Sequence, residues 1–347
     1  MMRSFKTNPD VFLNKKSKWR CIMRFNRTIP QFLVLFLILF CGYGESNLSP
    51  QQLFAAEQAN EYIDNIFSSR PGVDLNKYKR KWLDLVYANQ SPYQALDIYL
   101  PDEGQGPFPV IVALHGGSFV KGDKRDFQIV PMLEALKWGY AVIPVNYRLS
   151  PQSVFPSQIQ DVKAAIRWIR ANGDNYSLST QKIAVWGDSA GGNLAALAGT
   201  SAGVKALEDT TMGNPEQDSR VDAVIDWYGP INFLSMSSQL QQNNQPPRKG
   251  NSSYIGKSKD EAPELYAAAS PATYIHSGMP PFFIQHGNGD IVIPVQQSIE
   301  LAHQLEITMG KNGITLDILD RANHLDERFT TAENLDKVRK FLDAVIN

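Results

Sequence analysis

The chain has 347 residues, of which 43% are hydrophobic and 20% are charged, and its formal net charge is −1 at pH 7. This composition is typical of a globular protein with a full-sized core and excludes an intrinsically disordered chain. Beyond the N-terminal region there is no basic cluster, so we expect neither nucleic acid nor an anionic membrane surface as a partner. Small or neutral ligands fit this charge pattern better.

The N-terminal segment, residues 1–46, has the pattern of an export signal. It carries eight lysines and arginines against two acidic residues, and it includes the apolar run Phe32–Cys41. That run is too short for a bilayer core, which needs roughly 20 residues. Small residues follow it, so we expect cleavage near Gly44 or Ser46 and an exported protein, either secreted or periplasmic. Translation from Met23 would give a leader of ordinary length. The alternative is an uncleaved segment that anchors the protein to a membrane.

Both cysteines, Cys21 and Cys41, lie in this leader. A mature protein without them has no disulfide, no thiol nucleophile and no cysteine metal site. We expect residues 47–347 to form a single catalytic domain that is stabilised by its core.

After the leader, the sequence predicts an amphipathic helix over residues 49–67 and two strands over 82–88 and 95–101. The second of these strands alternates apolar and polar residues, with Asp97 on its polar side. Such alternation is typical of an edge strand with one face in water.

From residue 110 onward, short apolar runs alternate with segments of helical period, such as 157–173. The expected strands cover 110–114, 140–147, 182–186, 221–227, 281–285 and 314–319. Strands and helices that alternate in this way predict an α/β fold with a mostly parallel sheet flanked by helices. Residues 233–275, which are rich in Gln, Asn and Pro at their start, interrupt the pattern and are expected to form a lid-like insertion.

A serine lies at the turn between one such strand and the next helix. Gly187, Ser189 and Gly191 spell G-x-S-x-G, and the motif has the strand before it and the helix after it that its chemistry requires. Glycines are needed there because neighbouring Cβ atoms would clash in so sharp a turn. We therefore expect Ser189 to be a nucleophile.

A serine nucleophile needs a base, and the chain has five histidines. His324 follows the last strand in a short loop, at the sheet edge where loops after parallel strands gather. It is the best candidate for the base. The other four fit structural or surface roles, and they are His115, His276, His286 and His303.

The third member of a triad orients the imidazole and stabilises its charged form. Asp290 lies just after the strand 281–285, at its carboxyl end, and gives the chain order Ser, Asp, His of the α/β-hydrolase arrangement. Four other acidic residues near His324 are expected to be solvated or to cap helices: Asp317, Asp320, Asp326 and Glu327.

Acyl transfer also needs amide donors for an oxyanion. Gly116 and Gly117 follow the strand 110–114, and Ala190 begins the helix after the serine. These three residues are the expected oxyanion hole. A simple glycine turn is the alternative.

Several sequence blocks between Trp82 and Val345 together resemble a known family. The most informative are "PVIVALHGGSFVKGDK", "VNYRLSP", "KIAVWGDSAGGNLAAL", "PPFFIQHGNGDIVIPVQQS" and "ANHLDERF". They resemble the α/β-hydrolase esterases of the hormone-sensitive-lipase-like group, and most closely the bifunctional feruloyl and acetyl xylan esterase-like proteins. Two positions depart from the pattern: Ser118 stands where relatives commonly have a third glycine, and Leu325 where many have glycine.

The resemblance implies a serine hydrolase that cleaves carboxylic esters through an acyl-enzyme, with Ser189, Asp290 and His324 as the triad. It implies short-chain or carbohydrate-linked acetyl or feruloyl esters as substrates, with no metal and no organic cofactor. Alternatives are a lipase or arylesterase acting on other esters, a peptidase like the prolyl oligopeptidases, and a non-catalytic binding protein with a hydrolase fold. The sequence leaves the oligomeric state open.

Overall fold

A computed structural model of the chain describes residues 50–243, 245 and 250–346. The expected leader, residues 1–46, lies outside these ranges. The contacts among the described residues group them into one compact unit. No helix within this part of the chain combines the length and the apolar character that a membrane crossing needs.

The centre of the unit is an eight-stranded sheet with the order β1-β2-β4-β3-β5-β6-β7-β8. β1 and β2 pair antiparallel, as do β2 and β4, and all other neighbours run parallel. The predicted mostly parallel sheet is thereby confirmed. The strands are β1 (Lys81–Val86), β2 (Ala95–Tyr99), β3 (Phe108–Leu114), β4 (Ala141–Val145), β5 (Leu178–Asp188), β6 (Ala223–Trp227), β7 (Phe282–Gly287) and β8 (Ile314–Leu319).

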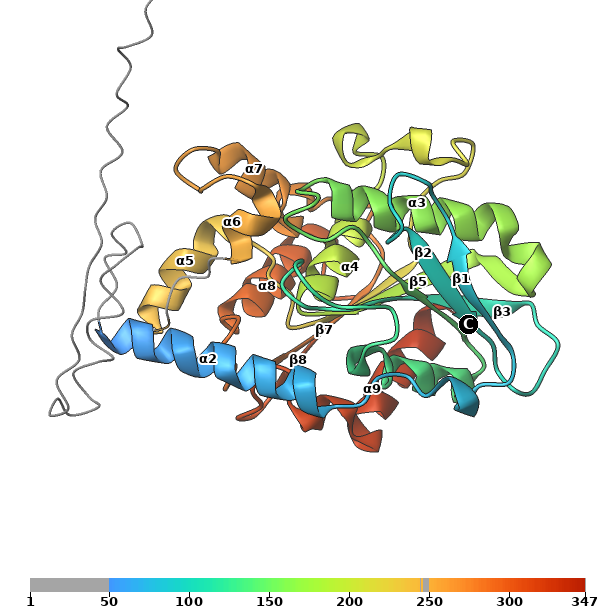
Figure 1. Cartoon of the computed structure of the whole chain (residues 1–347), viewed down its shortest axis with the longest axis horizontal. Coiled ribbons are helices and arrows are strands. Elements are labelled where there is room, and N and C mark those ends of the chain that lie inside the picture. Colours follow the sequence, from blue (N-terminus) through green and yellow to red (C-terminus); the bar gives the residue numbers. More distant parts are fainter. Residues whose placement is uncertain (1–49, 244, 246–249, 347) are drawn as a thin grey trace, which may run out of the picture. The chain divides into compact units, whose positions relative to one another are not determined.

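Helices cover both faces of this sheet (Figure 1). On one face pack α3 (Ser157–Asn172), α4 (Ala190–Thr200) and α8 (Gln296–Met309). On the other pack α9 (Ala332–Val345), α2 (Pro50–Ser69) and the 3₁₀ segment η3 (Met132–Trp138). Because the central strands are covered twice, their side chains are apolar on both faces, as in the fully buried β4 and β6.

The prediction that the strand around Asp97 is an edge strand with a wet face is wrong. β1 forms the edge, and β2 is buried along its whole length between β1 and β4. The Asp97 carboxylate is fully buried and lies 3.2 Å from Lys124 Nζ and 2.6 Å from Arg125 Nε. The alternation in this strand therefore reflects a buried ion cluster, since a charge inside a protein needs partners of opposite sign.

The segment 233–275 contains three short helices, α5 (Phe233–Gln242), α6 (Gly250–Ile255) and α7 (Pro263–Ala268). Tyr254 of α6 stacks on Phe119, with ring centroids 3.6 Å apart, and its carbonyl accepts a hydrogen bond from the Phe155 amide. Phe119 lies two residues after Gly117, in the loop that follows β3. The inserted segment therefore packs against the loop in which oxyanion donors are expected.

Candidate active site

Ser189 occupies a strained turn between β5 and α4, with φ of 52° and ψ of −118°. The two flanking glycines make this turn possible. A Cβ on Gly187 would lie 2.0 Å from the carbonyl oxygen of Gly191, and a Cβ on Gly191 would lie 2.1 Å from that of Leu114. Both distances are far below van der Waals contact, so the G-x-S-x-G spacing is a requirement of the local backbone.

Ser189, His324 and Asp290 meet at the carboxyl ends of their strands. The Oγ of Ser189 lies 2.9 Å from Nε2 of His324, and Nδ1 of His324 lies 2.7 Å from Oδ2 of Asp290. A carboxylate accepts hydrogen bonds, so Nδ1 is assigned the proton and Nε2 is free to accept one from the serine. The structure thus brings the three predicted residues together. The His324 imidazole lies between the Ser189 hydroxyl and the Asp290 carboxylate, as the base of a serine nucleophile would.

The carboxylate of Asp290 is held on both of its oxygens. Oδ1 accepts hydrogen bonds from the amides of Val292 and Ile293 at 2.7 and 2.8 Å. Burial alone would raise the pKa of this carboxyl, but the charge of His324 and hydrogen bonds from His286 and His324 hold its pKa well below the ordinary range. Asp290 therefore stays ionised and can stabilise a positive charge on His324.

The other candidate residues have different partners. His276 and His303 are exposed, Asp317 pairs with Lys337 and Asp326 caps the 3₁₀ segment η8 (Glu327–Thr330). His115 is buried, and burial lowers its pKa to about 4. Its ring stacks on Tyr147 and its Nδ1 lies 2.8 Å from the carbonyl oxygen of Gly116, so its role is structural.

The glycine loop lies directly against the nucleophile. A Cβ on Gly116 would come within 3.0 Å of the Ser189 Cβ. The carbonyl oxygen of Asp188 would also lie 3.0 Å from that Cβ, so Gly116 packs against both residues of the turn. Gly117 has φ of 109°, and Ala190 is the first residue of α4, where helix amides have no intrahelical partner.

The residue before the nucleophile is also part of the site, and sequence reasoning missed it. Asp188 accepts a hydrogen bond of 2.6 Å from Gln128 Nε2. Its burial raises its pKa to about 7, although Gln128 and the Gly116 amide oppose that shift. Asp188 therefore links the turn of Ser189 to Gln128, and both residues lie close to Gly116.

The N-terminal helix and the residue after it contact the histidine loop. Tyr62 of α2 donates its hydroxyl to the carbonyl of His324 at 2.9 Å, and Arg70 donates to the carbonyl of Leu325 at 2.9 Å. On the same helix, Asp64 pairs with Lys121 at 2.9 Å, four residues after Gly117. An amphipathic pattern predicted a helix here, but no local signal in the sequence pointed to its place beside the site.

The inserted segment also reaches the triad. Gln245 donates a hydrogen bond of 3.0 Å from Nε2 to the carbonyl of Asp290. On the other side, the ring of Tyr228 packs 4.7 Å from the ring of His324, between centroids. The imidazole is therefore fixed by an aromatic neighbour as well as by its hydrogen bonds.

The two departures from the family pattern share one backbone property. Ser118 has φ of 56° and Leu325 has φ of 58°, both in the left-handed region that glycine adopts most easily. The loops therefore keep the conformation a glycine would give, at a cost of about 1 kcal/mol per residue. Leu325 is buried against the core, with 4% exposure, so its side chain is used for packing.

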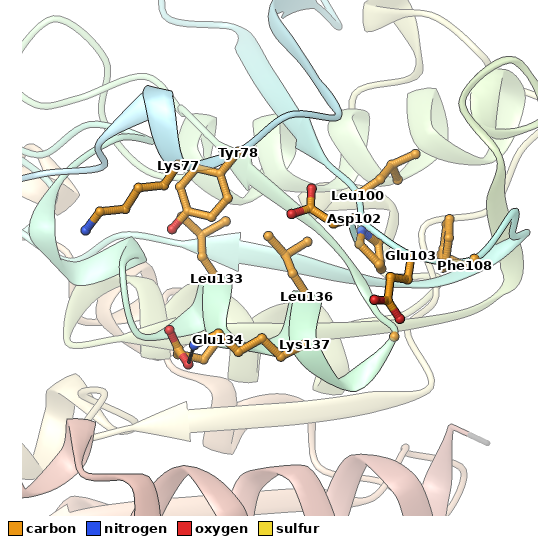
Figure 2. Close-up of a pocket in the computed structure, with 13 residues that line it drawn as sticks. Lys77, Tyr78, Leu100, Asp102, Glu103, Phe108, Leu133, Glu134, Leu136 and Lys137 are labelled. Atoms are coloured by element: carbon orange, nitrogen blue, oxygen red, sulfur yellow. Dashed lines mark hydrogen bonds and ion pairs between the residues drawn. The ribbon is translucent and has the colours of Figure 1, made fainter.

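A separate hollow of about 780 Å³ lies at the amino ends of β3 and β4 (Figure 2). Its lining includes Phe108, where β3 begins, and Gly139, just before β4, whereas the triad follows the ends of strands. Glu134 and Lys137 of this lining form an ion pair. Within the described ranges, no three His, Cys, Asp or Glu side chains are grouped as a metal site.

Comparison with known proteins finds relatives that are described as esterases. It is 32% identical to the probable carboxylic ester hydrolase LipM and 33% identical to the esterase LipQ, both from Mycobacterium tuberculosis, over 64% of this chain and 51% and 52% of theirs. The chain thus spans about half the length of these relatives.

Two solved structures are similar in sequence and fold. A truncated carbohydrate esterase from gut microbiota is 30% identical, with a TM-score of 0.71 over 79% of this chain and 98% of its own. A bifunctional GH43-CE protein of Bacteroides eggerthii is 33% identical, with a TM-score of 0.69 over 76% of this chain and 35% of its own. The BD-FAE family model matches residues 96–305, which is more than half of the chain. The chain therefore belongs to the BD-FAE family and has the α/β-hydrolase fold.

Proposed function

We propose that this protein is a serine esterase that hydrolyses carboxylic esters through an acyl-enzyme. The single observation that carries the proposal is the continuous hydrogen-bonded chain from Ser189 Oγ through His324 to Asp290. A hydroxyl becomes an effective nucleophile when a neighbouring base takes its proton, and this base is oriented by a carboxylate that stays ionised.

In the first half-reaction, His324 Nε2 takes the proton of Ser189 as Oγ attacks the ester carbonyl. Asp290 stabilises the imidazolium that forms. The tetrahedral intermediate collapses as His324 returns this proton to the leaving alcohol, which leaves the acyl group on Ser189. In the second half-reaction, His324 activates a water in the same way, and the carboxylic acid leaves.

The negative oxygen of the intermediate needs amide donors, and we assign this role to Gly117 and Ala190. Ala190 follows the nucleophile at the start of α4, and a helix N-terminus favours negative charge. Gly116, which packs against the Cβ of Ser189, is the third predicted donor. Removal of a single donor typically lowers kcat about a hundredfold or more.

For the substrate we infer a short-chain or carbohydrate-linked ester, such as an acetyl or feruloyl ester. Two observations support this choice. The solved relatives at 30% and 33% identity are described as a carbohydrate esterase and as a GH43-CE protein. Next to the glycine loop, the aromatic rings of Phe119, Phe233 and Tyr254 pack against one another, and we take this cluster to limit the length of the acyl group.

We further infer that the protein is exported. The support is the basic and apolar pattern of residues 1–46. N-terminal sequencing of the protein from its host tests this: a mature chain that begins near residue 45 supports export, and a chain that retains the apolar run contradicts cleavage.

The activity is tested with a fluorophosphonate probe and a panel of p-nitrophenyl esters. We expect the wild-type protein to be labelled and Ser189→Ala to be neither labelled nor active. Labelling that persists in Ser189→Ala, or a wild-type protein that is not labelled, contradicts the assignment. Acetylated xylan and methyl ferulate then test the substrate class. An activity that peaks at long acyl chains would contradict a carbohydrate ester as the substrate and favour a lipase.

A further inference from the structure

One oxygen of Asp290 faces two imidazoles. Oδ2 lies 2.7 Å from Nδ1 of His324 and 3.2 Å from Nε2 of His286, and all three side chains are at most 2% exposed. His286 is on β7, one residue before its end. The mechanism proposed above uses only His324, so His286 is a buried titratable group at the triad with no assigned role.

The surroundings of His286 determine which of its nitrogens carries a proton. Nε2 also lies 3.1 Å from the carbonyl oxygen of Ile293, and a carbonyl can only accept. Nε2 is therefore assigned the hydrogen, which points toward both Ile293 and the Asp290 carboxylate. On the other side of the ring, Nδ1 lies 2.7 Å from the hydroxyl of Ser298, a fully buried residue of α8 that can donate to it. The ring is thus held at both nitrogens.

We propose that His286 is a positioning residue for the triad, whose Nε2–H donates to Asp290 Oδ2 and limits how strongly this carboxylate raises the basicity of His324. The inference rests on the proposed function in taking His324 as the base. Its role differs from that of a packing residue, since it acts through the charge of the oxygen that His324 itself contacts.

The expected effect has a definite sign. A donor on a carboxylate oxygen draws negative charge away from its other hydrogen bonds. Without the His286 donor, Asp290 would stabilise the imidazolium of His324 more strongly, and the pKa of His324 would rise. The carboxylate would keep its place, because the amides of Val292 and Ile293 still bind Oδ1.

Other titratable groups face the same pair from the neighbouring elements. Asp226 on β6 interacts with His286, Tyr228 packs beside both histidines, and Tyr62 of α2 interacts with Asp290. All three are present in every variant described below. A difference between the two His286 variants therefore reports on the donor to Asp290.

Two substitutions separate the donor from the bulk of the ring. His286→Gln can place its amide nitrogen near the position of Nε2, whereas His286→Asn reaches only the position of Nδ1. The pKa of His324 is measured by NMR titration of ¹⁵N-labelled histidines without substrate, with His324→Gln to assign the signal. We expect this pKa to rise by about half a unit or more in His286→Asn and to stay near the wild-type value in His286→Gln.

The acid limb of the kcat/KM profile for p-nitrophenyl acetate should move to higher pH in His286→Asn by the same amount. An identical His324 pKa in both variants and the wild type overturns the inference, as does an equal shift in both variants. Should His286→Asn fail to fold, Ser298→Ala frees the ring at Nδ1, and we expect a smaller rise in the same direction; no rise there overturns the inference too. The NMR titration needs no turnover, so failure of the proposed function is seen separately as a missing Ser189 label.

Discussion

The hydroxyl of Tyr62 donates a hydrogen bond of 2.9 Å to the carbonyl oxygen of His324, across 262 positions of sequence. Arg70 makes the corresponding contact to the next carbonyl, that of Leu325. These are contacts from α2, and from the residue that follows it, to the backbone of the loop that carries the proposed base. They restrain that loop without touching the imidazole, so the position of His324 depends on a helix at the other end of the chain.

Loss of these contacts should therefore lower turnover more than substrate binding. We expect Tyr62→Phe and Arg70→Gln each to reduce kcat for p-nitrophenyl acetate by about threefold to tenfold, with a smaller change in KM, because a hydrogen bond of this kind contributes about 1 kcal/mol. The matched control is Ser68→Ala, since among the described residues this serine bonds within its own helix, to the carbonyl of Asn65. Equal kinetics in all three variants would show that the contacts do not position the loop.

The Asp290 carboxylate fixes the tautomer of His324, so Asp290→Asn should remove the base while leaving the fold intact. An asparagine that donates to Nδ1 forces the hydrogen onto Nε2, where it can no longer accept from Ser189. We expect kcat to fall by about 10⁴-fold. Thermal unfolding of the variant is the control, and a kcat within tenfold of wild type would remove Asp290 from the triad.

Substitution of Gly191, in the turn at Ser189, has two opposing local effects: a gain in helix propensity and a steric clash. Gly191 lies in α4, where alanine is the better helix former by about 1 kcal/mol. A Cβ there would nevertheless lie 2.1 Å from the carbonyl oxygen of Leu114. We expect Gly191→Ala to destabilise the protein by about 1–3 kcal/mol or more and to abolish most activity, because the strand and the helix must move apart.

The control for this variant is Gly278→Ala. A Cβ on Gly278 would approach nothing closer than 3.4 Å, and its backbone is not left-handed. We expect this change to alter the free energy of unfolding by no more than about 1 kcal/mol. A Gly191→Ala protein as stable as Gly278→Ala would show that the backbone at the nucleophile can relax around a methyl group.

Asp188 gives a prediction about pH. Burial raises the pKa of its carboxyl from 3.8 to about 7 in the folded protein. Between these values the folded state holds a proton that the unfolded state has released, so the contribution of Asp188 to stability falls as the pH rises through this range. Asp188→Asn cannot ionise and should avoid that loss.

The measurement is denaturant unfolding of both proteins at pH 5 and pH 8. We expect the variant to gain on the wild type as the pH rises, by up to about 1.4 kcal/mol per pH unit. The pKa of Asp226 is also raised, to about 6, but that carboxyl is present in both proteins and its effect cancels. Asp102→Asn, at an exposed carboxylate, serves as the control, and a stability difference independent of pH contradicts the raised pKa of Asp188.

The fold class and the meeting of Ser189, Asp290 and His324 could be predicted because both depend on short stretches of chain. Apolar runs of strand length mark the buried strands, and Ser189, Asp290 and His324 each lie at the end of one of them or in the loop that follows it. Carboxyl ends of parallel strands meet at one edge of a sheet, so their order along the chain was enough to predict their neighbourhood. The burial of Asp97 could not be predicted, for a related reason. Alternation shows which side of a strand is polar, but not whether that side meets water or two buried cations.

The sequence by itself thus determined the strands and helices, the strained serine turn and the residues at the strand ends, because periodicity and glycine geometry are local properties. Only the tertiary structure decided that α2 holds the histidine loop through Tyr62, that Gln128 bonds the carboxylate of Asp188, and that His286 shares an oxygen of Asp290 with His324. Each of these depends on a contact between segments that are distant in sequence or that belong to different elements. Such contacts exist only in the folded protein, where the helices pack on both faces of the sheet. No pattern within a single segment encodes them.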